Sequence, residues 1–545
     1  MTVQDSPARH RWGSEITEGQ VNGHPCLMFA ERPPSVTAVL EESRRWGERE
    51  FLIHGRRRVS FEAHHRAVCL IGARLHEHGV RPGDRVALLG GNSASWVASF
   101  YAILSTGAVA VLCNAWWSDA EVRHAIAETT PVLALVDDKR AARVGADLPT
   151  LSLETLAEHL GEQGPGDAAS GEQFTAMHTV VEDDPAVVLF TSGTTGLPKG
   201  ATLSHRSLVA NLQGLLMVSG RLPRETDDPH ARHSIGVVGL PIFHIGGLQL
   251  LLVGLTSGNT SVFLSGRFDP AEVLRLIETE RATVLSAVPT MIQRIVHHPD
   301  VAVRDTSTLR TIVMGGSPVS KEMLERVNAA FPSAHSRIGQ SYGMTELGGV
   351  VATGVGADLA GHPGSAGRLM PVAEVRIDAP DADGVGEIVV RSPAVMDGYW
   401  GRPDDPILDA DGWLRTGDLG RVDADRFLYI TGRAKDLIIR GGENIAAAHV
   451  EAQILAHPGV QEVAVVGLPH ADLGEEVAAA VVVSAGSRLS AAELAEYVRA
   501  KLAYFEVPSR WWIRTEALPH NDAGKLVKRL VAQDWQDSAG LRPKI

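Results

Sequence analysis

The chain has 545 residues, of which 44% are hydrophobic, 21% are charged and 5% are aromatic. This composition is typical of a folded globular protein of about three or four folding units, and it excludes a disordered chain. The net charge of −14 at pH 7 argues against a protein that binds nucleic acid through a basic surface. Cys26, Cys69 and Cys113 show no paired spacing, which excludes a disulfide scaffold and a cysteine-rich zinc site.

The N-terminal residues mix charges from the start and contain no apolar stretch, so we expect no signal peptide. The longest apolar run, residues 248–255, is shorter than the ~20 residues that a membrane-spanning helix needs. This run is predicted to be a buried helix. We therefore expect a cytoplasmic protein with no membrane span.

Strand-like and helix-like segments alternate over most of the chain. Short apolar runs separated by helical patterns are typical of a mostly parallel sheet that is covered on both faces. The predicted strands are residues 85–90, 108–113, 131–138, 186–190, 235–240, 283–288 and 311–313, with helices at 93–104 and 120–129. Residues 160–175 are rich in Gly, Ser and Glu and are predicted to form a surface loop.

The pattern changes after about residue 365. Residues 373–377, 386–392 and 426–430 alternate apolar and polar side chains, which predicts antiparallel strands in a small barrel or sheet. A compact α+β unit follows, with helices at 446–455 and 491–502 and strands at 460–468 and 476–483. We therefore predict an α/β fold with a large N-terminal domain, residues 1–434, and a small mobile C-terminal domain, residues 435–545.

The most specific motif is TSGTTGLPKG, residues 191–200, which directly follows a predicted core strand. Glycines and hydroxyl residues allow backbone N–H groups and side chains to surround a phosphate, and Lys199 adds a positive charge. The motif does not fit a Walker A loop, because Pro198 precedes the lysine and Gly200 follows it. The alternative is a flexible surface loop.

Four further motifs follow, of which the last three are weak when each is taken alone. Residues 339–346 (GQSYGMTE) contain a carboxylate suited to Mg²⁺ on a triphosphate, or they simply begin a capped helix. Residues 412–418 (GWLRTGD) provide an acceptor for ribose hydroxyls, or an ordinary Asp turn. Residues 432–436 (GRAKD) lie at the predicted domain boundary, and residues 521–525 (NDAGK) lie near the C-terminus.

Taken together, in this order and spacing, the motifs resemble those of the adenylate-forming superfamily. This superfamily contains acyl-CoA synthetases, peptide-synthetase adenylation domains and firefly luciferase. The resemblance covers about residues 60–530 and includes the phosphate motif almost letter for letter. It implies an enzyme that joins a carboxylate to MgATP, forming an acyl-adenylate and pyrophosphate. A thiol, usually that of CoA, then displaces AMP.

The resemblance also implies a role for individual residues. Glu346 and Thr191 would hold Mg²⁺, Lys525 would bridge the carboxylate and the α-phosphate, and Lys435 would be the hinge of the small domain. Lys525 and Lys435 also have a plain alternative as solvated surface lysines. The residues implied in ATP binding are Thr191, Ser192, Gly193, Thr194, Thr195, Gly196, Lys199, Gly316, Ser317, Pro318, Gln340, Ser341, Tyr342, Gly343, Thr345, Asp418, Arg433 and Lys525.

The resemblance places the acyl group beside His244, Gly315, Gly339 and Gly348. A histidine near apolar residues is otherwise a core residue, so His244 has both interpretations. Amino-acid-activating relatives carry an Asp near this position, and its absence here disfavours an amino-acid substrate. The glycines after Glu346 suggest an open apolar cavity, which favours a hydrophobic or aromatic acid.

Two departures from the superfamily pattern concern the thiol step. Residues 446–449 read AAAH where relatives have a Pro and then a Glu, and Glu506 stands where many relatives have a Lys. These departures leave adenylation intact and count against the CoA step. CoA is the expected acceptor, and a carrier protein or partner enzyme is the alternative. A non-catalytic ATP-binding or acyl-binding relative and a luciferase-like oxygenase are further alternatives, and a homo-oligomer is compatible with the sequence.

Overall fold

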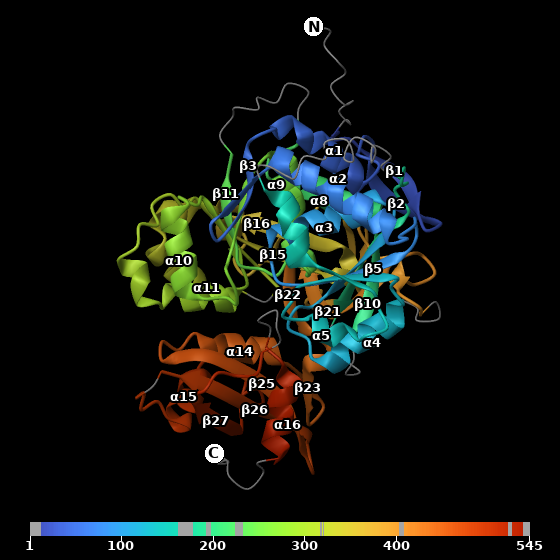
Figure 1. Ribbon diagram of the computed structural model, residues 1–545. Helices are drawn as coiled ribbons and strands as arrows, with labels where there is room; N and C mark the ends of the chain where they lie inside the picture. Colours follow the sequence, from blue (N-terminus) through green and yellow to red (C-terminus); the bar gives the residue numbers. More distant parts are fainter. Residues whose placement is uncertain are drawn as a thin grey trace.

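The computed structural model describes residues 12–161, 178–191, 198–223, 233–316, 319, 321–402, 408–484, 486–520 and 526–537. Two large sheets and the helices around them form the body of the molecule, and a smaller unit lies below it (Figure 1). A hairpin of β1 (Ile16–Val21) and β2 (His24–Phe29) lies at the edge of the body. The predicted loop at residues 160–175 lies almost entirely outside the described residues.

The first large sheet has seven strands in the order β20-β10-β9-β6-β5-β7-β8. The five strands from β9 to β8 in this order pair in parallel, as predicted from their apolar runs. β10 and β20 are antiparallel to their neighbours. The strands are β5 (Arg85–Leu89), β6 (Val109–Cys113), β7 (Leu133–Val136), β8 (Thr150–Ser152), β9 (Pro185–Thr191), β10 (Lys199–Ser204) and β20 (Gly398–Tyr399).

The second large sheet has thirteen strands in the order β18-β19-β21-β22-β17-β16-β15-β14-β13-β11-β12-β3-β4. The segment from β3 to β15 is parallel apart from the β4 edge, and the strands from β16 to β18 are antiparallel. The strands are β3 (Glu50–His54), β4 (Arg57–Ser60), β11 (Ile235–Val238), β12 (Thr260–Phe263), β13 (Val284–Ala287), β14 (Thr311–Gly315), β15 (Ile338–Met344), β16 (Gly349–Val355), β17 (Gly367–Leu369), β18 (Glu374–Asp378), β19 (Gly386–Arg391), β21 (Leu414–Val422) and β22 (Phe427–Arg433).

The antiparallel strands predicted after residue 365 are therefore present, and they continue the parallel sheet through the pairing of β15, β16, β17 and β22. This continuity matters for the site, because Tyr342 of β15 and Asp418 of β21 belong to one sheet and are joined by a hydrogen bond. Periodicity alone predicts strands but not which strands pair.

The helices of the body pack around both sheets. Helix α3 is buried along its whole length, because its residues are apolar or small on every side and contribute to a core shared by the two sheets. The helices are α1 (Val36–Glu42), α2 (Phe61–Glu77), α3 (Ala94–Ser105), α4 (Asp119–Thr129), α5 (Ala141–Val144), α6 (Leu153–Leu156), α8 (His205–Val218), α9 (Ile245–Ser257), α10 (Pro270–Thr279), α11 (Pro289–Val296), α12 (Lys321–Ala330) and α13 (Ala357–Gly361).

The smaller unit contains the elements predicted for the C-terminal part of the chain. Alternating side chains of its sheet face two separate cores, one under α14 and α15 and the other under α16. The elements are β23 (Leu437–Arg440), β24 (Glu443–Ala446), α14 (Ala447–Leu455), β25 (Val460–His470), β26 (Gly474–Val483), α15 (Ala491–Arg499), β27 (Arg510–Arg514) and α16 (Lys528–Asp537).

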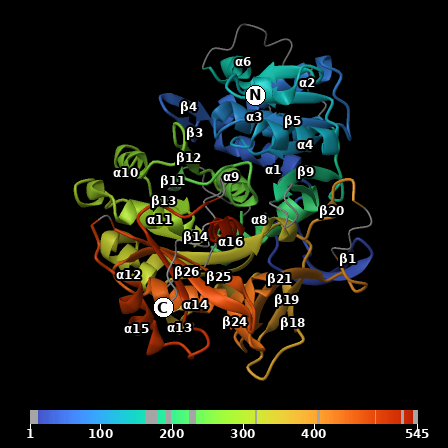
Figure 2. The same cartoon turned by 90° about the horizontal axis from the view of Figure 1, so that it is seen from below.

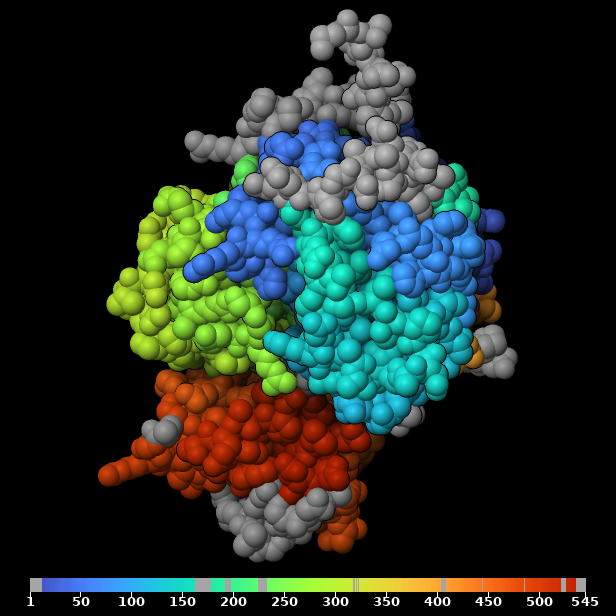
Figure 3. All heavy atoms as spheres, in the orientation of Figure 1, coloured from blue at the N-terminus to red at the C-terminus, as the bar shows by residue number. Residues whose placement is uncertain are grey.

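The smaller unit forms a lobe against the body in the space-filling view (Figure 3). Seen from below, its helices and strands lie in front of the second large sheet (Figure 2). One contact between lobe and body is a hydrogen bond of 2.6 Å from Gln293 Nε2 of α11 to the carbonyl of Gln461 in β25. Among the described helices, α9 contains the apolar run at 248–255, and none is long and apolar enough to cross a membrane.

Candidate active site

The phosphate motif lies where β9 ends and β10 begins. Thr191 is the last residue of β9, Lys199 is the first of β10, and the two are paired in the antiparallel ladder. The two ends of the motif are thus held side by side, where β9 ends and β10 begins. Ser192, Gly193, Thr194, Thr195 and Gly196 lie outside the described residues.

Tyr399 of β20 connects Lys199 with Glu346. Because β20 pairs with β10, the Lys199 ammonium lies 4.8 Å from the centre of the Tyr399 ring. The Tyr399 hydroxyl donates a hydrogen bond of 3.1 Å to Glu346 Oε1. The structure therefore brings the predicted lysine and carboxylate together and adds a tyrosine that the sequence analysis missed. Its two-residue strand has no periodic pattern by which it could have been found.

Glu346 is suited to Mg²⁺ that arrives with ATP rather than to a free-standing metal site. Among the described residues, no group of three or more His, Cys, Asp or Glu side chains is placed to hold a metal ion. Magnesium in nucleotide sites typically needs only one or two carboxylates in addition to phosphate oxygens and water. A single partly buried carboxylate near Lys199 fits that requirement.

A histidine of α4 fixes the far end of the phosphate motif and was also missed. His124 Nε2 lies 3.0 Å from the carbonyl oxygen of Pro198 and 3.1 Å from Glu128 Oε2. A carbonyl only accepts, so this ring nitrogen carries a proton. Glu128 Oε1 in turn accepts from Arg402 Nε at 3.1 Å.

Asp418 and its neighbours form the predicted ribose site. Asp418 is 5% exposed, and its two carboxylate oxygens accept from Tyr342 Oη at 2.7 Å and from Arg433 Nε at 3.0 Å. Burial and the Asp418 charge raise the pKa of Tyr342 well above its usual value, so its hydroxyl stays a donor. The arrangement follows from the register, because Asp418 and Arg433 are opposite each other on β21 and β22.

Several of the residues implied in ATP binding lie on or next to two neighbouring parallel strands, β14 and β15. Gly315 of β14 is paired with Ser341 of β15, and Gly316 follows with a φ of +87° that favours glycine. The amide of Gln340 donates to the carbonyl of Ser365. Ser317 and Pro318 lie outside the described residues.

Gly339 and Gly343 are required by the packing of β15 on β16. A Cβ at Gly339 would lie 2.5 Å from Val355 Cγ1, and one at Gly343 would lie 1.9 Å from the carbonyl oxygen of Gly349. Thr345 begins the short 3-10 helix Thr345–Leu347 that carries Glu346. For these two glycines, close packing of β15 on β16 explains the residue type without a ligand.

Aromatic rings surround the position predicted for the acyl group. His244 directly precedes α9, and its ring centre is 4.8 Å from that of Phe243. Phe243 packs edge-on against Trp116 at 5.2 Å, and the adjacent Trp117 packs against Phe190 of β9 at the same distance. The tryptophan pair thus links the predicted acyl region to the strand that leads into the phosphate motif.

The expectation of an open cavity at Gly348 and Gly349 was wrong. Gly348 has a φ of +68°, and a Cβ there would lie 1.9 Å from the carbonyl oxygen of Ala394. Gly349 has a φ of +131°, and its Cβ would lie 2.6 Å from Asn211 Oδ1. Both glycines are needed because the backbone turns and packs closely there, so they open no space for an acyl chain.

The C-terminal residues of the prediction are placed only in part. Lys435 is exposed in the 3-10 helix Ala434–Asp436 between β22 and β23, and Lys525 lies outside the described residues. The two departures from the superfamily pattern lie close to each other. His449 Nε2 is 3.9 Å from Glu506 Oε1. When His449 is protonated, it attracts Glu506, as the Glu and Lys that relatives have at these positions would attract each other.

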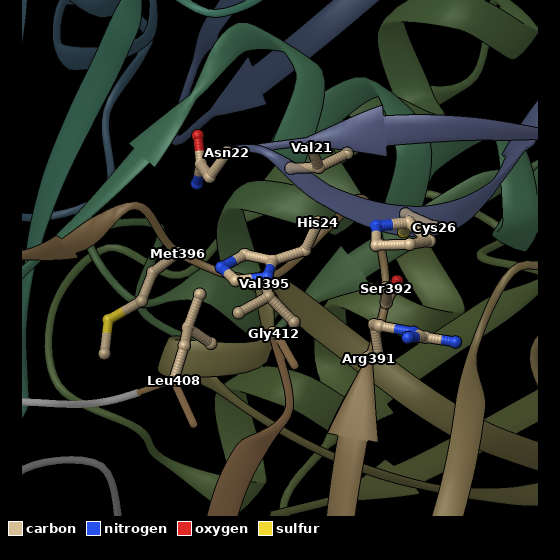
Figure 4. A pocket seen from close by; sticks show the side chains of 11 residues that line it. Val21, Asn22, His24, Cys26, Arg391, Ser392, Val395, Met396, Leu408 and Gly412 are labelled. Carbon is tan, nitrogen blue, oxygen red and sulfur yellow. The ribbon is translucent and has the colours of Figure 1, made fainter. Parts of the chain in front are cut away.

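A small cavity of about 20 Å³ lies between the β1–β2 turn and residues 391–396 (Figure 4). It is large enough for about one water molecule. Its lining includes His24, Cys26 and Arg391 and none of the predicted site residues. The cavity is therefore separate from the candidate site.

Comparison with known proteins assigns the chain to a family. The family model described as AMP-binding enzyme matches residues 39–400, and the model of the AMP-binding enzyme C-terminal domain matches residues 449–525. A feruloyl-CoA synthase from Amycolatopsis sp is 36% identical over 481 residues, covering 87% of this chain and 94% of the relative. The fatty acid–[acyl-carrier-protein] ligase ScoC of Streptomyces coeruleorubidus is 34% identical over 531 residues, covering 94% and 96%.

The chain is also similar in fold to solved structures. The crystal structure of ATP-bound MatB from Rhodopseudomonas palustris superposes with a TM-score of 0.79 at 28% identity. The superposition covers 92% of this chain and 99% of that chain.

Proposed function

The chain belongs to the AMP-binding enzyme family and is an AMP-forming acid–thiol ligase that uses ATP, Mg²⁺ and CoA, and we propose that its acid is hydrophobic or aromatic. In the first half-reaction the carboxylate oxygen bonds to the α-phosphorus of ATP, and pyrophosphate leaves. In the second, the thiol sulfur bonds to the acyl carbon, and AMP leaves.

The observation that carries the choice of acid is the aromatic surround of His244. The Phe243 ring packs beside His244, and the Trp116 ring packs edge-on against Phe243 in turn. The core around them is apolar, and it includes the buried side chains of Ile242 and Leu248. Above this core the rings of Trp116 and His244 are only partly buried and offer an apolar and aromatic surface. Such a surface favours an acid with a hydrophobic body, because burial of nonpolar area provides the binding free energy. The similarity to a feruloyl-CoA synthase supports an aromatic acid in particular.

We assign the charged groups by the part of the reactants that they neutralise. Lys199 and Glu346 serve the phosphates, the latter through Mg²⁺, which would neutralise charge on the triphosphate. Asp418 accepts from the ribose hydroxyls, and Lys525 neutralises the carboxylate and the α-phosphate. Two anions have to meet in line, so positioning and charge neutralisation account for most of the rate enhancement.

We also propose that residues 1–434 and 435–545 are separate domains that move about Lys435. Support comes from the short 3-10 segment between β22 and β23 and from the two cores that the C-terminal unit has of its own. The absence of Cys-rich sites and disulfides among the described residues is compatible with a cytoplasmic enzyme, which we propose.

The second candidate function is transfer of the acyl group to a carrier protein. The similarity to a fatty acid–[acyl-carrier-protein] ligase over 94% of the chain favours it. The His449–Glu506 contact is relevant here, because these departures lie in the unit expected to face the incoming thiol.

The proposal is tested by pyrophosphate release with a panel of acids. Cinnamic-type acids, medium-chain and long-chain fatty acids and an amino acid are offered with MgATP, first without a thiol and then with CoA or a phosphopantetheinylated carrier protein. We expect release with the aromatic or fatty acids and thioester formation with CoA. Release only with the amino acid would contradict the proposed acid, and thioester formation only on the carrier would favour the second candidate.

A further inference from the structure

Tyr399 occupies a position between the two charged groups that are assigned to the phosphates. Its ring lies under the Lys199 ammonium at 4.8 Å, and its hydroxyl donates to Glu346 Oε1 at 3.1 Å. Lys199 begins β10 of the seven-stranded sheet, and Glu346 follows β15 of the thirteen-stranded sheet. A single side chain thus joins residues that come from different sheets.

The backbone that carries Tyr399 is firmly held. β20 pairs with β10 through Ala201 and Tyr399, and hydrogen bonds follow on both sides of that pair. The amide of Trp400 donates to the carbonyl of Gly200 at 2.7 Å, and the amide of Asp397 donates to the carbonyl of Thr202 at 2.9 Å. The phenol therefore projects from a fixed position.

Glu346 has a fixed backbone and a side chain with three rotatable bonds. Its carbonyl oxygen accepts from the amide of Met396 at 3.0 Å. A hydrogen bond to Oε1 restricts rotation of the carboxylate while leaving Oε2 available for another partner. Because a side chain held before binding loses less entropy on binding, such a bond favours cation binding at the carboxylate.

We propose that Tyr399 is a positioning residue that orients Glu346 for Mg²⁺ and holds Lys199 toward the triphosphate. The inference rests on the proposed function of these two residues. The hydroxyl acts on the cation through the Glu346 carboxylate, and the ring acts on the phosphates through the Lys199 ammonium. Removal of the hydroxyl alone should therefore affect Mg²⁺, and removal of the ring should affect ATP as well.

The test compares Tyr399→Phe, Tyr399→Leu and the control Tyr429→Phe. The control is matched, because Tyr429 Oη also donates to a carboxylate, Asp423 Oδ2, at 3.1 Å and lies outside the site. Binding of the non-reacting analogue α,β-methylene-ATP is measured by calorimetry over a range of Mg²⁺ concentrations. Pyrophosphate release is followed in parallel with varied ATP and varied acid.

For Tyr399→Phe we expect the Mg²⁺ concentration at half-maximal analogue binding to rise about tenfold, as for loss of a hydrogen bond to a charged group. Tyr399→Leu should in addition weaken analogue binding at saturating Mg²⁺ about two- to fivefold, as for loss of a partly exposed cation–π contact. The KM for the acid should be unchanged in both variants. In the control Tyr429→Phe, the Mg²⁺ dependence and analogue binding should equal those of wild type.

Unchanged Mg²⁺ dependence in Tyr399→Phe would overturn the inference, and tighter Mg²⁺ binding would show that the tyrosine competes with the cation. An equal change in the KM values for ATP and acid would also overturn it, because that result indicates a general structural role. If wild type binds the analogue but releases no pyrophosphate with any acid, the proposed function fails instead, and the binding data still decide the role of Tyr399.

Discussion

Replacement of Asp418 tests the ribose site. The effect can be estimated, because each of its carboxylate oxygens accepts from a known donor, Tyr342 or Arg433. Asp418→Ala removes the acceptor for ribose hydroxyls and leaves the Tyr342 hydroxyl without its 2.7 Å partner. Loss of a hydrogen bond to a charged acceptor corresponds to about 1.5–3 kcal/mol. At about 1.4 kcal/mol for each factor of ten, the KM for ATP should rise about 10- to 100-fold.

The stability cost of Asp418→Ala follows from the same contacts. A donor left unsatisfied in a buried position costs about 1–3 kcal/mol, so thermal unfolding should occur at a lower temperature. The ion pair with Arg433 adds about 1 kcal/mol or less, because that side chain is 45% exposed. Asp418→Asn keeps an oxygen for Tyr342 and loses only the charge, so it should be more stable than the alanine variant.

The assay is pyrophosphate release with ATP varied at saturating acid and with acid varied at saturating ATP. Thermal unfolding of each variant is measured alongside, and kinetics are taken well below the unfolding temperature. A selective rise in the KM for ATP supports the assignment. An unchanged KM for ATP in Asp418→Ala, or a rise confined to the KM for the acid, would refute it.

Three further predictions concern acid stability, backbone packing and the phosphate motif. Burial lowers the pKa of His64 to about 3, so below about pH 6.5 the unfolded chain binds a proton that the folded chain does not. As the pH is lowered from 6.5 toward 3, the free energy of unfolding should therefore fall by about 1.4 kcal/mol for each pH unit. His64→Leu should reduce that slope in denaturant titrations between pH 4 and 6.5, and an unchanged slope would contradict the assigned cause. Gly348→Ala should lower the free energy of unfolding by at least about 1–2 kcal/mol for its positive φ alone, which thermal unfolding would register as a lower midpoint temperature. An unchanged midpoint would show that the close contact with Ala394 relaxes freely. His124→Phe should raise the KM for ATP but not that for the acid, and His124→Gln should restore much of the loss through its amide donor to Pro198; equal losses in both variants would argue against this hydrogen bond.

Local sequence patterns predicted those parts of the fold that depend on neighbouring residues. The strand expected at residues 85–90 is β5, Arg85–Leu89, and the helix expected at 93–104 is α3, Ala94–Ser105. Apolar runs and a capping serine are enough for such elements. The joining of the antiparallel strands to the parallel sheet depends on long-range pairing, which no periodicity records.

The candidate site also contains residues that the sequence predicted and residues that only the structure shows. Lys199, Glu346 and Asp418 belong to contiguous motifs and were found from them. Tyr399 is about 200 residues from Lys199 and 53 from Glu346, and His124 is 74 residues from Pro198. Only the pairing of β10 with β20 and the packing of α4 reveal them. A residue type recognisable at a motif is thus easier to predict than its supporting neighbours.

Glycines and substitutions were the least predictable from the sequence. Gly348 followed the motif carboxylate and suggested space for an acyl chain, whereas its positive φ and backbone contact explain it fully. His449 and Glu506 each departed from the superfamily pattern, and only the structure shows that the two lie near one another. Whether a missing Cβ opens a cavity, or two departures compensate, depends on three-dimensional contacts.

Separate measurement of the two half-reactions in Lys525→Ala tests the two-step ligase most directly. Wild type with a preferred acid and MgATP should form acyl-adenylate and one equivalent of pyrophosphate without a thiol, and CoA should then yield the thioester and AMP. The variant should lose the first step by about 10²- to 10³-fold, as for removal of one preorganised charge-stabilising group. It should convert a supplied acyl-adenylate to thioester at nearly the wild-type rate. Equal damage to both steps, or formation of ADP in place of AMP by wild type, would contradict this account.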